Sequence, residues 1–175
     1  LPVALAPGQN IIITTPFHVK LPYNFSRSGH IGQSYQAAQW YPKPAVYDSK
    51  GWHPMPYLDQ GEFYNEFGNY DVTITIPQNY AVASTGVLQN EEEKDWLKSR
   101  AAFLWEERKY RKKIKKGSYK IVRELFPASS SAYKTLHYKQ ENVVDFAWFA
   151  DKRFIVNYDT CRLPAGNTVD VFSFY

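Results

Sequence analysis

Cysteine is almost absent from this sequence, and long apolar runs are absent altogether. Cys161 is the only cysteine among 175 residues, so neither an intrachain disulfide nor a cysteine-based zinc site can form. Arg162 follows this thiol, and a neighbouring cation can activate a cysteine, but a lone cysteine in a predicted strand more often packs in the interior. No apolar run reaches 18 residues, which excludes a transmembrane helix.

The start of the chain lacks the features of a secretory signal. Residues 1–15 have neither a basic beginning nor a cleavage-type ending. The chain opens at Leu1 without a methionine. We therefore expect a processed protein or an excised fragment.

Histidine is scarce, and its spacing gives no metal motif. No two of the four histidines lie at the i, i+4 spacing that places two imidazoles on one helix face, and H-E-x-x-H is absent. A site could still assemble from His30, His53 and Glu62 if the fold brought them together. The simpler interpretation is that both histidines bond to loop backbone.

Motifs for nucleophilic and phosphate chemistry are also missing. The chain has no G-x-S-x-G elbow, no G-x-x-x-x-G-K-[ST] loop and no G-x-G-x-x-G loop. A carboxylate pair suited to glycoside hydrolysis could come from four acidic residues of one stretch. The simpler interpretation is that these side chains accept hydrogen bonds from loop amides and tyrosines. They are Asp48, Asp59, Glu62 and Glu66.

The net charge of +4 is unevenly distributed. The run from Arg108 to Lys116 (RKYRKKIKK) holds seven of the 21 basic residues, so 14 remain against 17 acidic residues. No general nucleic-acid-binding surface is implied by this balance. The run could meet phosphate or an anionic membrane surface, or it could be a solvated helix or hairpin end.

The most unusual stretch runs from His30 to Pro77. It has no regular helical or strand pattern before residue 71, and irregular stretches of this length are usually functional or disordered. Disordered segments are poor in aromatic residues, whereas this one is rich in them. We expect an ordered surface loop, pinned by buried rings, that forms a binding site. Its rings are Trp40, Tyr41, Tyr47, Trp52, Tyr57, Phe63, Tyr64 and Phe67.

Short alternating runs predict strands along much of the chain. The clearest is 71–76, whose apolar residues Val72, Ile74 and Ile76 share one face. Residues 80–87 would form its partner in an antiparallel hairpin or meander, interrupted at Gly86. Further strands are predicted at 10–15, 17–21, 134–139, 153–158 and 168–174.

One helix is predicted from Asn90 to about Trp105. Asn90 and Glu93 have the spacing of a capping box, and the acidic first turn suits the helix dipole. No linker is long enough to divide the chain. The sequence therefore predicts one domain over residues 1–175. We expect a mainly β, antiparallel sandwich or saddle-like domain with a long aromatic-rich loop and one short helical excursion.

Several uncommon sequence words resemble one family. They are SRSGH (26–30), GQSYQ (32–36), QWYPKPAVYD (39–48), GWHP (51–54), DVTITIP (71–77), ASTG (83–86) and NVVDFAWFAD (142–151). In this order they resemble the N-terminal β domain of aminopeptidase N-like zinc metallopeptidases, in the branch found in Bacteroidetes-type bacteria. The similarity spans nearly the whole chain.

The resemblance implies a non-catalytic part of a larger enzyme. In that family a thermolysin-like catalytic domain follows and carries H-E-x-x-H, a distal zinc-binding glutamate and a Gly-x-Met-Glu-Asn stretch. None of these occurs in residues 1–175. We therefore expect the zinc on a catalytic domain of the same polypeptide, no cofactor in this segment, and no peptide hydrolysis by this chain alone. A location in the bacterial cell envelope or outside the cell fits the same resemblance.

One binding residue is implied by the resemblance. The family's N-terminal domain supplies a Gln or Glu that binds the free α-amine of the peptide substrate. Gln36, ahead of Tyr41-Pro42, matches this position best, although the spacing is shorter here, and Gln39 is the alternative. The remaining alternative is a loop glutamine bonded to backbone.

A different class of function also fits the sequence. The aromatic loop could stack sugar rings, so a stand-alone carbohydrate- or protein-binding β-sandwich module is the rival to the peptidase domain. Two or three exposed, coplanar rings would favour carbohydrate binding.

Overall fold

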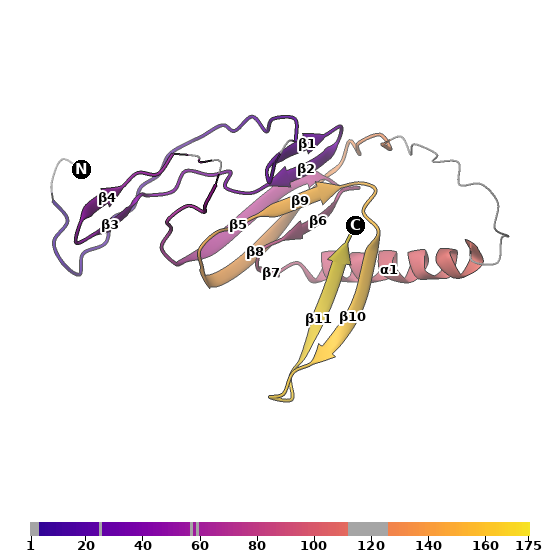
Figure 1. The fold of residues 1–175 in the computed structure, drawn as a ribbon. Helices are drawn as coiled ribbons and strands as arrows, with labels where there is room; N and C mark the ends of the chain where they lie inside the picture. Colours follow the sequence, from indigo (N-terminus) through magenta and orange to yellow (C-terminus); the bar gives the residue numbers. More distant parts are fainter. Residues whose placement is uncertain (1–3, 25, 57, 59, 112–125) are drawn as a thin grey trace.

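The computed structural model describes residues 4–24, 26–56, 58, 60–111 and 126–175, and this part of the chain is mainly β with several antiparallel sheets and one helix (Figure 1). The predicted mainly β, antiparallel class is therefore confirmed. No helix in the described part is long and apolar enough to cross a membrane.

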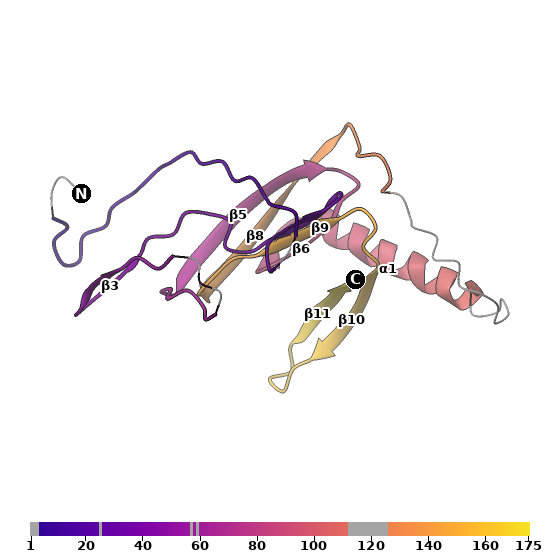
Figure 2. The same cartoon turned by 45° about the horizontal axis from the view of Figure 1, so that its top comes forward.

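Two sheets carry the body of the domain. The first has the order β5 (Gly68–Pro77), β8 (Tyr133–Val143) and β7 (Val87–Leu88). The second has the order β1 (Gly29–Ile31), β2 (Ser34–Ala37), β9 (Trp148–Asp151) and β6 (Ala81–Ser84). Two hairpins extend from this body, as Figures 1 and 2 show: β3 (Val46–Asp48) with β4 (Gly51–His53), and β10 (Val156–Arg162) with β11 (Thr168–Phe174).

The two sheets share one hydrophobic core. Ile74 on β5 pairs with Leu136 on β8, and both side chains are buried. Val82 on β6 and Ala150 on β9 bring the second sheet into the same cluster, with Phe146 fully buried beside them. The alternation predicted for 71–76 and 134–139 therefore does place its apolar face on the core, in a sandwich-like arrangement.

The predicted hairpin between 71–76 and 80–87 is wrong. β5 pairs with β8, about 60 residues later in the chain, and the 80–87 segment divides into β6 and β7, which join different sheets. Gly86 makes the crossing with a φ of +90°, and a Cβ there would lie 2.7 Å from the Lys139 carbonyl oxygen. Only glycine fits this close approach. Gly86 therefore lies between two separate strands, whereas the sequence predicted one strand interrupted at this residue.

The strands predicted at 10–15 and 17–21 are also absent. These residues form no strand, and Ile12 and Ile13 are 91% and 73% exposed. β-branched residues favour strands only where a partner strand and a buried face are available. Within the described residues this segment has neither.

Helix α1 (Glu91–Arg111) begins where predicted and extends beyond Trp105. The basic run thus begins in the last turn of the helix, and its remainder, 112–116, lies outside the described residues. The expected capping box does not form. The Asn90 side chain instead accepts from the His137 amide (2.7 Å) and donates to the Thr135 carbonyl (3.2 Å), which ties the helix start to β8.

An ion pair makes a second connection between α1 and β8. Lys134 Nζ lies 2.6 Å from Glu93 Oε1, and both side chains are about nine-tenths buried. The same ammonium lies 4.1 Å from the centre of the Trp96 ring. Burial raises the pKa of Glu93 and lowers the pKa of Lys134, because the desolvation of each charged group outweighs the stabilisation by its partner.

This pair predicts an asymmetric mutational result. Glu93→Gln leaves the Lys134 ammonium buried without its counter-charge, so it should lower the free energy of unfolding by about 3 kcal/mol. Glu93→Leu combined with Lys134→Met removes both charges and should recover most of that loss. Urea denaturation followed by circular dichroism measures all three proteins.

The matched control is Glu91→Gln in the same helical turn, where Glu91 is exposed and pairs with Lys94. This surface substitution should change stability by less than about 0.5 kcal/mol. Equal losses for Glu93→Gln and Glu91→Gln would contradict the assigned role of the buried pair.

Candidate functional site

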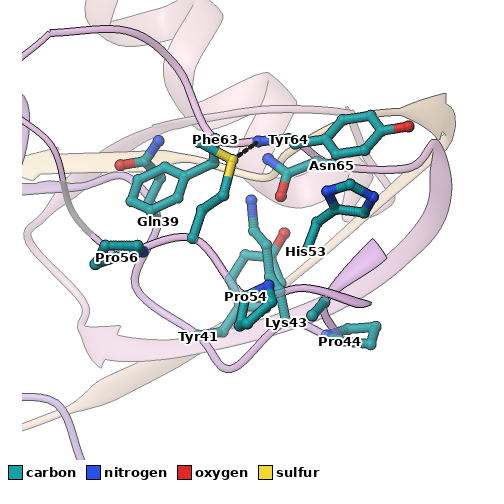
Figure 3. Close-up of a pocket in the computed structure, with 12 residues that line it drawn as sticks. Gln39, Tyr41, Lys43, Pro44, His53, Pro54, Pro56, Phe63, Tyr64 and Asn65 are labelled. Carbon is teal, nitrogen blue, oxygen red and sulfur yellow. Dashed lines mark hydrogen bonds between the residues drawn. The ribbon is translucent and has the colours of Figure 1, made fainter. Parts of the chain in front are cut away.

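A pocket of about 460 Å³ lies within the long aromatic stretch. We call it the loop pocket, and Figure 3 shows its lining. Its residues are Gln39, Tyr41, Lys43, Pro44, Ala45, His53, Pro54, Met55, Pro56, Phe63, Tyr64 and Asn65. The volume is in the range of pockets that hold small ligands.

Three passes of the chain build this pocket. The first leaves β2 and turns at Gln39, whose φ of +54° lies in the left-handed region. The second follows β4 through three residues that include Pro54 and Pro56, which keep the backbone extended. The third returns towards β5, and the Tyr64 amide meets the Met55 sulfur at 3.4 Å. A left-handed backbone at a residue other than glycine is uncommon and often marks a functional site.

The sheet side of the pocket rests on Asp145. Its Oδ1 accepts from the Tyr41 hydroxyl (3.0 Å) and from the Phe146 amide (2.7 Å), and it pairs with Lys43 Nζ (2.8 Å). The Tyr41 hydroxyl is also bonded to the Tyr70 hydroxyl at 2.7 Å. Burial, the Tyr70 hydrogen bond and the Asp145 charge together raise the pKa of Tyr41, so its hydroxyl stays protonated.

The outer side of the pocket rests on a carboxylate–histidine pair. His53 Nε2 lies 2.8 Å from Asp48 Oδ1, and the same carboxylate accepts from the Lys50 amide. The His53 bond, helped by that amide, lowers the pKa of Asp48. The His53 ring meets Tyr64 edge-on at 5.3 Å. Asp48 therefore orients His53. The sequence suggested that His53 bonds to loop backbone, but its partner is this side chain.

The residues weighed for a metal site do not meet. His30 Nδ1 bonds to the Gly32 carbonyl (3.2 Å), as the simpler interpretation expected, and Glu62 pairs with Arg27 (2.5 Å). Among the described residues no group of three or more His, Cys, Asp or Glu side chains could hold a metal ion. Of the four carboxylates considered for glycoside hydrolysis, Asp59 lies outside the described residues, and both Asp48 and Glu62 are already bonded to cationic or histidine partners.

Several rings of the aromatic stretch are exposed, although we expected buried rings to pin this loop. Tyr47 and Trp52 face each other across the β3–β4 hairpin and are 66% and 67% exposed. Their centroids lie 4.9 Å apart, but the ring planes are inclined by 57°. Tyr64 and Phe67 are exposed as well. Only some of the rings expected to pin the loop are therefore buried. The two rings of the exposed pair are not coplanar.

Gln36 and Gln39 occupy different places. Gln39 lines the loop pocket. Gln36 lies on β2 between Tyr35 and Ala37, which both contact the core region, so its side chain faces the opposite side of the sheet. Its neighbours across the sheet are Gly29 on β1, which has no side chain, and Phe149 on β9. Neither glutamine side chain has a hydrogen bond within the described residues, in contrast to the backbone-bonded loop glutamine that was one alternative.

Cys161 lies on β10, as the strand prediction implied, but it is exposed and does not pack in the interior. The residues that sequence reasoning missed are Lys43 and Asp145. Both stand in sequence words quoted above, but Asp145 is about 100 residues from Lys43 in the chain, and nothing near Lys43 indicates that the two meet.

Comparison with family models, with curated proteins and with solved structures gives no match for this chain.

The hydrogen bonds among Tyr41, Tyr70 and Asp145 predict a measurable loss of stability when the Tyr41 hydroxyl is removed. Tyr41→Phe removes the hydrogen bonds to Asp145 and Tyr70 and should lower the free energy of unfolding by about 1.5–2 kcal/mol. Tyr47→Phe is the matched control, because the exposed Tyr47 hydroxyl has no hydrogen bond within the described residues. It should leave stability within about 0.5 kcal/mol of the unchanged protein. Thermal and urea unfolding measure both, and a Tyr41→Phe protein as stable as the control would contradict the network.

Proposed function

We propose that this chain is the non-catalytic N-terminal β domain of a zinc aminopeptidase-like metallopeptidase. Its role would be to form the part of the substrate cleft that takes the peptide N-terminus. The family assignment rests on the sequence words given above. The structural observation that supports the role is the unpartnered Gln36 amide on the outer face of the β1-β2-β9-β6 sheet.

The chemistry required of Gln36 is modest. Its side-chain carbonyl oxygen can accept a hydrogen bond from an α-ammonium group. The backbone of β2 is fixed between β1 and β9, so the carbonyl is presented from a rigid element. A held amine positions the peptide, and positioning lowers the barrier of a later step without any bond being broken by this chain.

Gln36 suits an amine better than Gln39 does. The loop pocket that contains Gln39 also contains the Lys43 ammonium and no carboxylate in its lining. An incoming ammonium would meet a like charge there. Gln36 lies outside this lining, so we assign the amine contact to Gln36.

Bond cleavage would need a zinc ion on a catalytic domain of the same polypeptide, where it would polarise the scissile carbonyl and activate water. The described residues of this chain offer no ligand set for that ion. The contribution of this chain is thus limited to binding and orientation.

Kinetics of an enzyme that contains this domain would test the assignment. Gln36→Ala should raise KM for peptides with a free N-terminus roughly tenfold, because one hydrogen bond to a charged group is lost. Gln36→Glu should keep or lower KM, since a carboxylate also accepts from an ammonium. Gln78→Ala, at an exposed turn, is the matched control. An unchanged KM for Gln36→Ala would remove Gln36 from the site.

A second measurement tests the enzyme class itself. Residues 1–175 alone should show no hydrolysis of aminoacyl chromogenic substrates, whereas a parent protein with H-E-x-x-H after Tyr175 should hydrolyse them in a zinc-dependent way. A parent sequence without H-E-x-x-H would end the peptidase proposal. Hydrolysis by residues 1–175 would show that a catalytic site lies within this chain.

The rival function is a carbohydrate- or protein-binding module, and the exposed Tyr47–Trp52 pair favours it. Two exposed rings could stack on sugars, although their 57° inclination does not give one flat platform. Trp fluorescence titrated with oligosaccharides separates the two functions. Saturable quenching that disappears in Trp52→Ala would support the module.

A further inference from the structure

The loop pocket combines one cation with an apolar lining. Lys43 is the only lysine or arginine among its twelve residues, and no aspartate or glutamate lines it. The remaining lining comes from aromatic rings, prolines, Ala45, Met55, the amide side chains of Gln39 and Asn65, and the His53 imidazole. A pocket of this composition favours an anionic group attached to an apolar body.

Lys43 is held in place and still has a free donor. An ammonium group has three N–H donors, and Asp145 takes one of them at 2.8 Å. The Asn65 amide, in the orientation that satisfies both of its ends, accepts a second from Lys43 at 3.3 Å. No hydrogen-bond acceptor among the described residues takes the third, and the ammonium also lies 5.2 Å from the centre of the Tyr41 ring. In Figure 3 the Lys43 amino group points towards the middle of the pocket, between Tyr41 and Asn65.

The Lys43 ammonium forms an ion pair with the Asp145 carboxylate. The same carboxylate oxygen also accepts from the Tyr41 hydroxyl and the Phe146 amide, so three donors share one negative charge. The Lys43 side chain is 19% exposed. A ligand that reaches it would displace little water and would meet a preorganised ammonium, a geometry in which charge-assisted hydrogen bonds are strong.

The apolar part of the pocket defines the rest of the ligand. Phe63 and Tyr64 enter from the third pass of the loop, and Met55 and Pro54 enter from the second. Figure 3 shows Phe63 on the side of Gln39, and Tyr64 with His53 on the opposite side. These walls suit an aromatic or branched aliphatic group, because they offer rings and a thioether and few polar atoms.

We propose that the loop pocket binds a carboxylate carried on an aromatic or other apolar body, with Lys43 as the anion contact. A single ammonium matches a singly charged carboxylate better than a doubly charged phosphate. This inference does not rest on the proposed peptidase role, because Gln36 is not part of the pocket. The same chemistry occurs at the end of a peptide chain and in free organic acids.

NMR titration of the 175-residue chain tests the proposal with a matched pair of probes. N-acetyl-phenylalanine carries a carboxylate, and N-acetyl-phenylalaninamide has the same body without the charge. The acid should shift the amide resonances of Tyr64 and Asn65 and bind about tenfold more tightly than the amide, because only the acid forms a charge-assisted bond. Added salt should weaken the binding of the acid and leave the binding of the amide unchanged.

Variants of the contact residue complete the test. Lys43→Gln should reduce the affinity for the acid to that for the amide, and Lys43→Arg should retain the preference for the acid. Lys50→Gln, at the exposed tip of the β3–β4 hairpin, is the control and should behave as the unchanged protein. If Lys43→Gln fails to fold, the comparison of acid with amide on the unchanged chain and on Lys43→Arg still decides.

A further probe distinguishes the source of the carboxylate. Tighter binding of N-acetyl-phenylalanine than of 3-phenylpropanoate supports a peptide end, and equal binding supports a free organic acid. Equal affinity for acid and amide, a preference that survives Lys43→Gln, or no saturable shift with any probe would each overturn the proposal.

Discussion

The pairing of β5 with β8 is the constraint on which the rest of the described structure depends. It joins segments about 60 residues apart and buries Ile74 against Leu136 at the centre of the core. Its far end places Tyr70, near the start of β5, beside Asp145, just after β8, and both contact Tyr41. A one-residue slip in this register would turn the core faces to solvent and would also separate the residues that support the loop pocket.

Polar contacts attach the aromatic loop to the segment that follows β8. The Trp40 indole donates to the Phe146 carbonyl at 3.0 Å, and Asp145 binds both Tyr41 and Lys43. Each of these contacts spans more than 100 residues of sequence. The loop therefore takes its shape from the segment between β8 and β9 more than from its own hydrogen bonds. The β3–β4 hairpin, which carries exposed rings, lies outside this network.

The domain offers two chemically different surfaces. Gln36 presents a neutral acceptor on a sheet face, where an ammonium could bind. The loop pocket presents an ammonium among apolar walls, where a carboxylate could bind. One short stretch of chain contributes to both surfaces, because β2, which carries Gln36, ends only two residues before Gln39. The two proposals can therefore be tested separately by substitutions that do not share a side chain.

Local periodicity was enough to predict the mainly β class, the faces of 71–76 and 134–139, the start of α1 and the strand at 168–174. Other features depend on long-range contacts: β5 pairs with β8, residues 10–15 form no strand, and Asn90 binds β8 instead of capping its helix. The same contacts place Gln39 in a pocket with Lys43 and leave Gln36 outside it. The physical reason is that strand pairing, burial and desolvation are set by distant partners, and a partner such as Asp145 leaves no trace in the residues beside the site it supports.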